Sequence, residues 1–174
     1  MKLTTERLLL RPFESTDIDE RYLGWLQDPE VTRFSNQRFR QHTMESCFTY
    51  QRSFSGNSNT FLLLEHRADN VQIGTMTIYR AANHGTADIG LMVGNKTYWR
   101  QGLGLEAWRV VLQALLREPV IRKVTGGTAR PNSGMVKIME QSGMTLEAVR
   151  SQQELIEGQS VDLLYYARFA KDLA

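Results

Sequence analysis

The sequence predicts an α/β (α+β) fold: a mixed, mostly antiparallel sheet of about seven strands with about four flanking helices. The first observation is a run of three apolar segments separated by short polar turns, which indicates an antiparallel meander. The second is a strand, a glycine-bearing turn, an amphipathic helix and a further apolar segment in the middle of the chain, which indicates a parallel crossover. The third is a closing pair of strand-like segments joined by a tight turn at residues 157–159.

The composition is that of an ordinary globular protein. Its 174 residues are enough for one domain with a real core, so residues 1–174 are taken as a single domain. The net charge of +2 is too weak to indicate a nucleic-acid partner. The single Cys47 excludes an internal disulfide framework and suits a reducing compartment. No segment reaches the ~20 apolar residues of a membrane span, and the first residues do not read as a signal peptide. We expect a cytoplasmic protein without a membrane partner.

The elements of the first half follow from caps, breakers and apolar spacing. Ser15 or Thr16 caps a helix in which Ile18, Tyr22, Trp25 and Leu26 recur at helical spacing, and Asp28–Pro29 ends it. A polar segment, 35–40, is expected to be irregular. In order, the expected elements are a strand at 7–11, this helix, a short helix at 30–34, a helix at 44–54 capped by Thr43, and strands at 60–66, 71–79 and 86–94.

The second half is built around two helices. The first helix runs from the glycines to about Arg117 and is two-sided, with Trp108, Val111, Leu112 and Leu115 on its apolar face. Asn132–Ser133 caps the second, on which Met135, Ile138 and Met139 share a face, and Gly143 ends it. The expected strands are 120–128, parallel to 86–94, and then 146–155 and 160–168.

Gly102 and Gly104 stand at the start of the first of these helices. Free N–H groups and the helix dipole make such a position suitable for phosphate or pyrophosphate, although many Gly-x-Gly pairs are only turns. Gly102-x-Gly104-x-x-Ala107 also satisfies the dinucleotide-binding fingerprint. Three features disfavour a nicotinamide cofactor: segment 95–101 separates the strand from the glycines, the next strand carries no carboxylate, and the unit lies past the midpoint of the chain.

The same stretch resembles a known motif. Residues 87–94 followed by Tyr98–Ala107 resemble the acetyl-CoA-binding motif of the GNAT acetyltransferases, Gln/Arg-x-x-Gly-x-Gly/Ala. Trp99 takes the first position, as is common in the branch containing the ribosomal-protein N-terminal alanine and serine acetyltransferases. Asn132 with Glu140 and Gly143–Met144 looks like that family's second helix, and residues 5–12 and 22–34 are similar to this branch. The matches run from residue 4 to about residue 166.

The resemblance implies a GNAT fold with acetyl-CoA as co-substrate and no metal. Its middle strand and the parallel partner would splay apart, freeing backbone groups of Leu91, Met92 and Val93 to bind the pantetheine arm. Asn132 would contact the pantetheine or the far arm of the cofactor, in addition to capping its helix. Lys96 and Arg100 could add charge near the phosphates. Backbone N–H groups would hold the pyrophosphate at Arg100, Gln101, Gly102, Leu103, Gly104 and Leu105.

The implied chemistry is direct attack of a primary amine on the thioester in a ternary complex. Asp88 is the candidate base, because it lies 14 residues before Gly102, where relatives with a catalytic glutamate carry theirs. Strand alternation places it on one face with Gly90 and Met92. A structural carboxylate, or one acting through water, remains open. Strand N–H groups near Met92 would stabilise the oxyanion.

The proton donor for the thiolate departs from the family pattern. Met139 stands where many relatives have tyrosine, and Met135 where this branch often has serine; neither can donate a proton. Tyr165, Tyr166 and Tyr79 are the substitutes, of which Tyr166 is taken as the candidate. The thiolate can also leave unassisted, since a thiol has a pKa near 8.5.

The acceptor is expected to bind under the early helices, at Asn36, Arg38 and Phe39, with Tyr79 and His84 nearby. Arginines around an aromatic ring suit an anionic partner such as a nucleotide phosphate or a carboxylate. Relatives with a similar 22–31 segment often accompany amino-sugar pathways, so a small amine, such as a nucleotide-linked amino sugar, is favoured.

Two alternatives stay open beside the disfavoured nicotinamide-dependent enzyme. A protein N-terminal amine could be the acceptor instead, and Met135 and Met139 also allow a non-catalytic acyl-CoA-binding module. The sequence is compatible with a monomer, or with a homodimer paired through the last hairpin.

Overall fold

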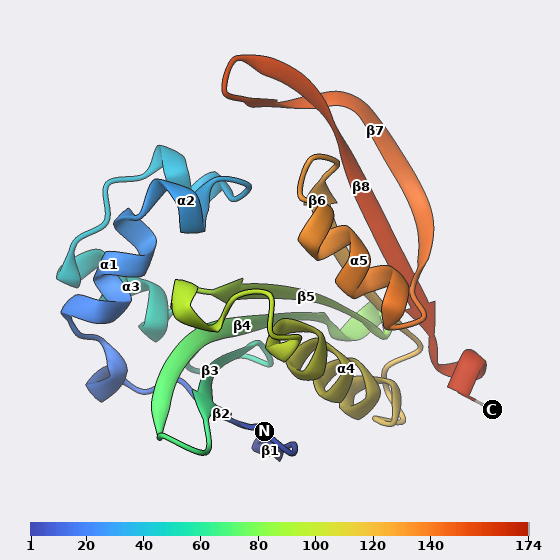
Figure 1. Ribbon diagram of the computed structural model, residues 1–174. Helices are drawn as coiled ribbons and strands as arrows, with labels where there is room; N and C mark the ends of the chain where they lie inside the picture. The colour runs from blue at the N-terminus through green and yellow to red at the C-terminus, as the bar shows by residue number, and fades with distance from the viewer. Residues whose placement is uncertain (174) are drawn as a thin grey trace.

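An eight-stranded sheet forms the centre of the structure, a computed structural model that describes residues 1–173 (Figure 1). The strand order is β1-β2-β3-β4-β5-β6-β8-β7, and within the described residues only β5 and β6 pair in parallel. The strands are β1 Leu3–Thr4, β2 Leu8–Pro12, β3 Thr60–His66, β4 Val71–Ala81, β5 Thr86–Val93, β6 Lys123–Ala129, β7 Thr145–Ile156 and β8 Gln159–Phe169. The mixed, mostly antiparallel sheet is confirmed. The additional strand is β1, whose two residues are too few to show a periodic pattern.

The described residues form five α-helices, where about four were expected. They are α1 Glu20–Gln27, α2 Pro29–Thr32, α3 Met44–Arg52, α4 Leu103–Leu116 and α5 Ser133–Gln141. Short 3-10 helices connect them: η1 Ser15–Asp17, η2 Asn36–Phe39, η3 Ala82–His84, η4 Lys96–Tyr98 and η5 Ala170–Leu173. No helix within residues 1–173 combines the length and apolar composition needed to cross a membrane.

The first helix begins later than the sequence pattern indicated. Asp19, not Ser15 or Thr16, caps α1 by accepting a hydrogen bond from the Tyr22 N–H at 2.9 Å. Residues 15–17 form η1 because Asp17 is drawn into a buried, two-bond ion pair with Arg11, at 2.8 Å for each bond. The contact between β2 and η1, which is invisible to local spacing, therefore decides where the helix starts.

The strand expected at 120–128 begins at Lys123 instead. Ile121 N–H donates to the Glu118 carbonyl, which makes a turn after Pro119, and Val120 is 72% exposed. Pairing with β5 begins only where Lys123 meets Thr86. Val120 is thus an apolar residue inside a turn, which hydrophobicity alone does not distinguish from the first residue of a strand.

Each face of the sheet carries its own hydrophobic core. One core lies against α4 and α5 and includes Trp108, Val111, Leu112 and Leu115, which confirms the predicted apolar face of α4. The other lies against α1 and α3 and includes Phe13, Tyr22, Trp25 and Phe61. In β5, Ala87 and Ile89 belong to the first core, whereas Met92 packs against the second.

The two parallel strands separate after three residue pairs. Pairing of β5 with β6 ends at Asp88 and Thr125, although both strands continue, so β5 from Ile89 onward has a free edge. The indole of Trp108 packs beneath Gly126 at this point, at 2.8 Å from the position of an added Cβ. The splayed parallel pair implied by the resemblance is confirmed, and a buried side chain of α4 supports its opening.

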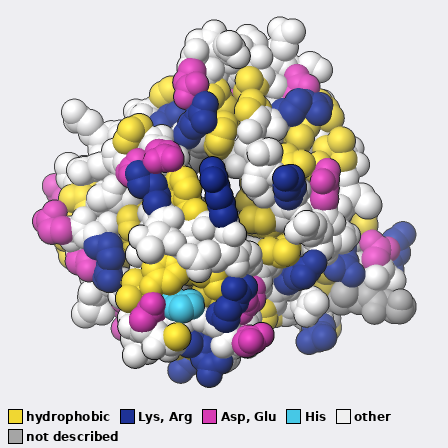
Figure 2. Space-filling view, in the orientation of Figure 1, with side chains coloured by type: hydrophobic (Ala, Val, Ile, Leu, Met, Phe, Trp, Pro, Cys, Tyr) yellow, Lys and Arg dark blue, Asp and Glu magenta, His cyan; other side chains and the backbone are white. Residues whose placement is uncertain are grey.

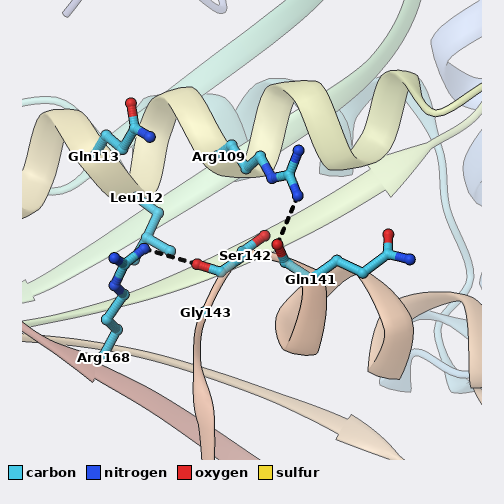
Figure 3. Close-up of a pocket in the computed structure, with 7 residues that line it drawn as sticks. All are labelled: Arg109, Leu112, Gln113, Gln141, Ser142, Gly143 and Arg168. Atoms are coloured by element: carbon cyan, nitrogen blue, oxygen red, sulfur yellow. Dashed lines mark hydrogen bonds between the residues drawn. The ribbon is translucent and has the colours of Figure 1, made fainter.

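Two arginines connect α4 and β8 to the C-terminal end of α5 (Figure 3). Arg109 donates to the Gln141 carbonyl at 2.7 Å, and Arg168 donates to the Ser142 carbonyl at 2.8 Å. They line a cavity of about 240 Å³. Cations at the C-terminal end of a helix satisfy its unpaired carbonyls and favour its dipole, so this cavity belongs to the packing of the fold.

Candidate functional site

The turn between β5 and α4 presents a row of backbone N–H groups. Arg100 and Gly102 both have positive φ angles, 61° and 77°, and turn the chain into the helix. Within residues 1–173, the N–H groups of residues 100–102 donate to no protein acceptor, and those of 103–105 form the first turn of α4, which has no intrahelical partners. Successive N–H groups at a helix N-terminus form a concave anion site, so this turn fits a pyrophosphate group.

Side chains from three segments hold this turn in place. Trp99 Nε1 donates to the Val93 carbonyl at 2.7 Å, which ties the turn to the end of β5. Arg7 Nη1 donates to the Gln101 carbonyl at 2.9 Å, while its Nε donates to Glu106 Oε2 at 2.7 Å. Sequence reasoning did not assign Arg7 and Glu106 to the site. The sequence signal for this pair is Glu106, a carboxylate in the first turn of a helix whose N-terminus is expected to bind an anion. A negative side chain at such a place would repel the anion unless a nearby cation neutralises it.

The Arg7–Glu106 pair should therefore affect cofactor binding indirectly, by holding the turn in place. We expect Arg7→Met to raise the Kd for acetyl-CoA about tenfold, because the Gln101 carbonyl loses a charged donor. Glu106→Gln should have a smaller effect of the same sign, and the double variant should be less impaired than the sum of the two. Titration calorimetry of the three variants measures this. Strict additivity would show that Arg7 and Glu106 do not act as a unit.

The two glycines serve different purposes. Gly102 adopts the left-handed conformation that residues with a side chain rarely take, as the N-cap of α4 requires. Gly104 lies in the helix, where an added Cβ would come within 3.2 Å of Ile138 Cδ1 and 3.3 Å of Leu91 Cδ2. Gly104 thus permits close packing of α4 on α5 and β5.

The two cations near the turn are placed differently. Lys96 Nζ lies 2.8 Å from Asp28 and 2.9 Å from Glu30, and these carboxylates raise the pKa of Lys96 to about 12. Its charge is already neutralised, and it links η4 to α2. Arg100 is exposed.

The backbone groups expected to receive the pantetheine arm lie on the free edge of β5. Leu91 packs toward the α4 core and Met92 toward the α1 core, so the strand is held from both sides. The Val93 carbonyl already accepts the Trp99 indole. The free edge from Ile89 to Val93 therefore leads from the splay to the anion site.

Asn132 is an N-cap in this structure. Its Oδ1 accepts from the Met135 N–H at 3.3 Å, and its Nδ2 donates to Thr128 Oγ1 at 3.0 Å. These contacts orient the side chain between α5 and the end of β6.

Asp88 lies where the parallel strands part. Thr125 Oγ1 donates to its carboxylate at 2.7 Å. Solvent reaches the carboxylate, yet surrounding protein removes much of its hydration, which raises the pKa of Asp88 above its ordinary value against the opposing effect of the Thr125 hydrogen bond. A carboxyl with a raised pKa is a stronger base when ionised, as proton abstraction near neutral pH requires.

Tyr79 stands beside Asp88, and a second tyrosine, Tyr50, contacts Tyr79. Tyr79 pairs directly with Asp88 across β4 and β5, so the two side chains share one face of the sheet. The Tyr79 hydroxyl lies 2.8 Å from the Tyr50 hydroxyl of α3. Of the residues expected to bind the acceptor, Tyr79 is the one that the register brings next to the candidate base.

The structure does not bring Tyr166 together with Asp88. Tyr166 is 4% exposed, belongs to the core against α4 and α5, and donates to Glu140 Oε1 at 3.1 Å. Burial and this carboxylate raise the pKa of Tyr166. Tyr165 faces the other way: it pairs with Gly127, two residues after the Asp88-bonded Thr125 on β6. Strand alternation thus separates two neighbouring tyrosines.

The polar segment expected to be irregular forms η2 and contacts the β7–β8 hairpin. Arg38 donates to the Leu155 carbonyl at 3.1 Å, lies 3.8 Å from Glu154 and stacks over the Phe39 ring at 4.2 Å. Asn36 is exposed, and Phe39 is 71% exposed. Arg38 is thus engaged within the protein, and Asn36 and Phe39 face solvent.

Another ion pair joins the end of α2 to the β7–β8 hairpin. Arg33 makes two hydrogen bonds to Glu157, at 2.9 and 3.0 Å. Figure 1 shows the hairpin tip extending toward α2, and Figure 2 shows Lys and Arg side chains scattered over the same face among hydrophobic ones. His84, which was expected near this segment, lies in η3, where its carbonyl accepts from Arg122 Nε at 2.8 Å.

Comparison with known proteins adds to this geometry. A family model described as an acetyltransferase (GNAT) domain matches residues 7–145. A GNAT-family acetyltransferase structure from Bacillus anthracis is 22% identical with a TM-score of 0.83, covering 98% of this chain and 99% of that one. RimL, a ribosomal L7/L12 α-N-protein acetyltransferase in complex with coenzyme A, is 15% identical with a TM-score of 0.81, covering 95% of each chain.

A spermidine N-acetyltransferase from Vibrio cholerae, in complex with CoA and spermine, is 15% identical with a TM-score of 0.83, covering 96% of this chain and 98% of that one. At these identities the likeness shows a shared fold. No curated protein matches the sequence significantly.

Proposed function

The chain belongs to the GNAT acetyltransferase family, which uses acetyl-CoA, and from this premise we propose that it transfers the acetyl group to a primary amine within a ternary complex. One observation carries the proposal: the free edge of β5 runs from Asp88 at the splay to the unpartnered N–H groups before α4. Its five residues span roughly 16 Å, room for an extended pantetheine arm. Leu91, Met92, Val93, residues 100–105 and Asn132 are the proposed contacts.

In the proposed reaction the neutral amine nitrogen attacks the thioester carbonyl, so that a C–N bond forms and the C–S bond breaks. Asp88 takes a proton from the amine, directly or through a water molecule. Backbone N–H groups of β5 near Met92 stabilise the developing oxyanion. The thiolate leaves and is protonated from solvent.

We propose a structural role for Tyr166, because its ring is buried in the core and its hydroxyl donates to Glu140. Tyr166→Phe should leave kcat within about threefold of wild type, since a thiol pKa near 8.5 lets the thiolate leave unassisted. The same change should lower stability by about 1 kcal/mol through the lost hydrogen bond. Steady-state kinetics and thermal unfolding measure both. A fall in kcat of about 100-fold would instead identify Tyr166 as the general acid.

We propose a small amine, such as a nucleotide-linked amino sugar, as acceptor. Two contacts favour it over the N-terminus of a protein, because Arg33–Glu157 and Arg38–Leu155 join η2 and its neighbours to the hairpin. A polypeptide entering between these elements would have to break them. The likeness to RimL keeps a protein N-terminal amine as the second candidate.

Release of free thiol from acetyl-CoA in the presence of single amines tests the proposal. The set contains a nucleotide-linked amino sugar, spermidine and a short peptide with a free N-terminus, each matched with its N-acetylated form. We expect release with a free amine and none with its blocked form. Binding of acetyl-CoA without release for any amine would support a non-catalytic module.

Thermal unfolding tests whether the protein binds acetyl-CoA or NAD. A ligand at 100 times its Kd should stabilise the protein by about 2.7 kcal/mol. Stabilisation by NAD and not by acetyl-CoA would contradict the proposal.

A further inference from the structure

A cavity of about 550 Å³ opens beside η2, enclosed by the end of α1, α2 and the start of α3. This is within the size range of small-molecule sites. Among residues 1–173, its polar lining comes from Gln27, Gln37, Arg38, Arg40, Gln41 and His42 together with two threonines, and no carboxylate lines it. A cavity with two guanidinium groups, an imidazole and amides, and with no acidic side chain, favours an anionic occupant.

The two arginines of this cavity differ in their engagement. Arg38 is committed to the Leu155 carbonyl and to Glu154, as described above. Arg40 is exposed, and within residues 1–173 its guanidinium has no hydrogen-bonded or ion-paired partner. An unpaired guanidinium offers planar, two-pronged recognition of phosphate or carboxylate.

The start of α3 does not supply the anion site of this cavity. The Thr43 hydroxyl accepts from the Ser46 N–H at 3.1 Å, and the Ser46 hydroxyl accepts from the Thr43 N–H at 3.0 Å. This reciprocal capping box already uses the helix N-terminus. His42 is also engaged, because its Nε2 lies 3.0 Å from the Gln37 carbonyl. Arg40 is therefore the cation of the lining that remains available.

The N-cap of α3, Thr43, lines the cavity, and the same helix carries Tyr50, one of two phenols on the side of the candidate base. The Arg40 charge reaches the Tyr50 phenol, where it acts against the burial and the Tyr79 hydrogen bond that raise the pKa of Tyr50. Tyr50 contacts Tyr79 at 2.8 Å, and Tyr79 pairs with Asp88. Arg40, just before α3, and Asp88 on β5 are thus related through the side chains of Tyr50 on α3 and Tyr79 on β4.

We propose that this cavity binds an anionic group, phosphate or carboxylate, of the acceptor, with Arg40 as its anchor, while the acceptor amine lies at Asp88. The inference rests on the proposed acetyl transfer and narrows its substrate class to amines that carry an anion. It assigns recognition of the anion to Arg40 in place of Arg38, because Arg38 is already bonded to the hairpin. Phosphate and carboxylate share the chemistry that a guanidinium recognises, so the experiment separates them.

The test compares amines that differ only in the anion. Linear ω-amino phosphates with two, four and six carbons are compared with the corresponding uncharged amino alcohols and with ω-amino acids of the same lengths. We expect kcat/KM to be at least about tenfold higher for an anionic amine than for its alcohol at one of these lengths. The better of the phosphate and carboxylate series identifies the source of the anion.

Arg40→Gln should remove this preference by raising KM for the anionic amine about tenfold or more, with the alcohol unchanged. Arg40→Lys should restore part of it, because the charge returns without the planar fork. The matched control is Arg52→Gln, which removes one exposed charge at the other end of α3 and should keep the preference. Circular dichroism and thermal unfolding verify that each variant is folded.

Equal kcat/KM for anionic and neutral amines in wild type would overturn the inference, and turnover of the alcohols would show that the acetyl transfer itself stands. A preference that survives Arg40→Gln, or that Arg52→Gln removes equally, would also overturn it. If acetyl-CoA binds but no amine is acetylated, the proposed function fails and the inference fails with it.

Discussion

Asp88→Asn is expected to lower kcat by about 100-fold or more while leaving the Kd for acetyl-CoA unchanged. The amide keeps the size of the side chain and can still contact the Thr125 hydroxyl, but it cannot take a proton from the acceptor amine. The proposed cofactor contacts lie further along β5 and in the turn at 100–105. Steady-state kinetics and calorimetric titration with acetyl-CoA separate the two effects. Unchanged turnover would remove Asp88 as the base.

The role of Asp88 as base also predicts the direction in which kcat changes with pH. The ionised carboxylate is the base, so kcat should fall as the pH drops through the pKa of Asp88, which burial raises above the usual aspartate value near 3.9. Thr125→Val removes the hydroxyl that lowers this pKa, so the acidic limb of the profile should move to higher pH. In Asp88→Asn the limb should vanish. A limb that persists in this variant belongs to another group.

Stability should respond in the opposite direction to activity. A carboxyl whose pKa is raised in the folded protein favours folding most when protonated, below its unfolded pKa, and loses that contribution as the pH rises through its folded pKa. At neutral pH the ionised Asp88 is therefore unfavourable to the fold, and Asp88→Asn should unfold at the same or a higher temperature. A clear loss of stability would indicate a structural carboxylate.

Gly104→Val is the second change with a large expected effect. Its branched side chain would press on Ile138 Cδ1 and Leu91 Cδ2, which lie 3.2 and 3.3 Å from the position of a Cβ. Overpacking of this kind costs roughly 1–3 kcal/mol. The relief is a shift of α4 away from α5 and β5, which moves the N–H groups of the turn. We expect the Kd for acetyl-CoA to rise about 100-fold, as measured by calorimetry.

Gly24→Val is the matched control, because Gly24 lies in α1 with nothing within 4 Å of an added Cβ. Both changes place the same β-branched residue in an α-helix, so they share the same propensity effect. Gly24→Val should leave acetyl-CoA affinity unchanged and stability within about 1 kcal/mol of wild type. If both variants lose affinity equally, the packing around Gly104 is not what positions the turn.

Regular, local features of the chain were open to prediction from sequence. The apolar face of α4 with Trp108, the capping of α5 by Asn132 and the turn at Gly102 all depend on residues a few positions apart. Hydrophobic spacing, caps and positive φ angles are near-neighbour effects, so they are visible in a sequence. The splayed pair was expected only through the family resemblance, because strand separation depends on what packs beneath it.

Long-range ion pairs decided what local patterns did not show. Arg11–Asp17 postponed the start of α1, and Arg7–Glu106 connects residues 99 positions apart. Arg38 was expected to face an anionic substrate, but the β7–β8 hairpin supplies Leu155 and Glu154 as its partners. A charged side chain pairs with whatever the fold brings within a few ångströms, and that partner cannot be read from neighbouring residues.

By itself, then, the sequence determined the element order, the glycine turn at Gly102 and the position of Asp88 on β5, because each follows from local backbone preferences and strand alternation. Only the tertiary structure decided which charged groups remain available. It placed Tyr166 in a core with its hydroxyl bonded to Glu140, and it engaged Arg38 with the hairpin. It left Arg40 beside a cavity without a side-chain partner among residues 1–173. Availability depends on partners distant in sequence, and folding alone brings those partners together.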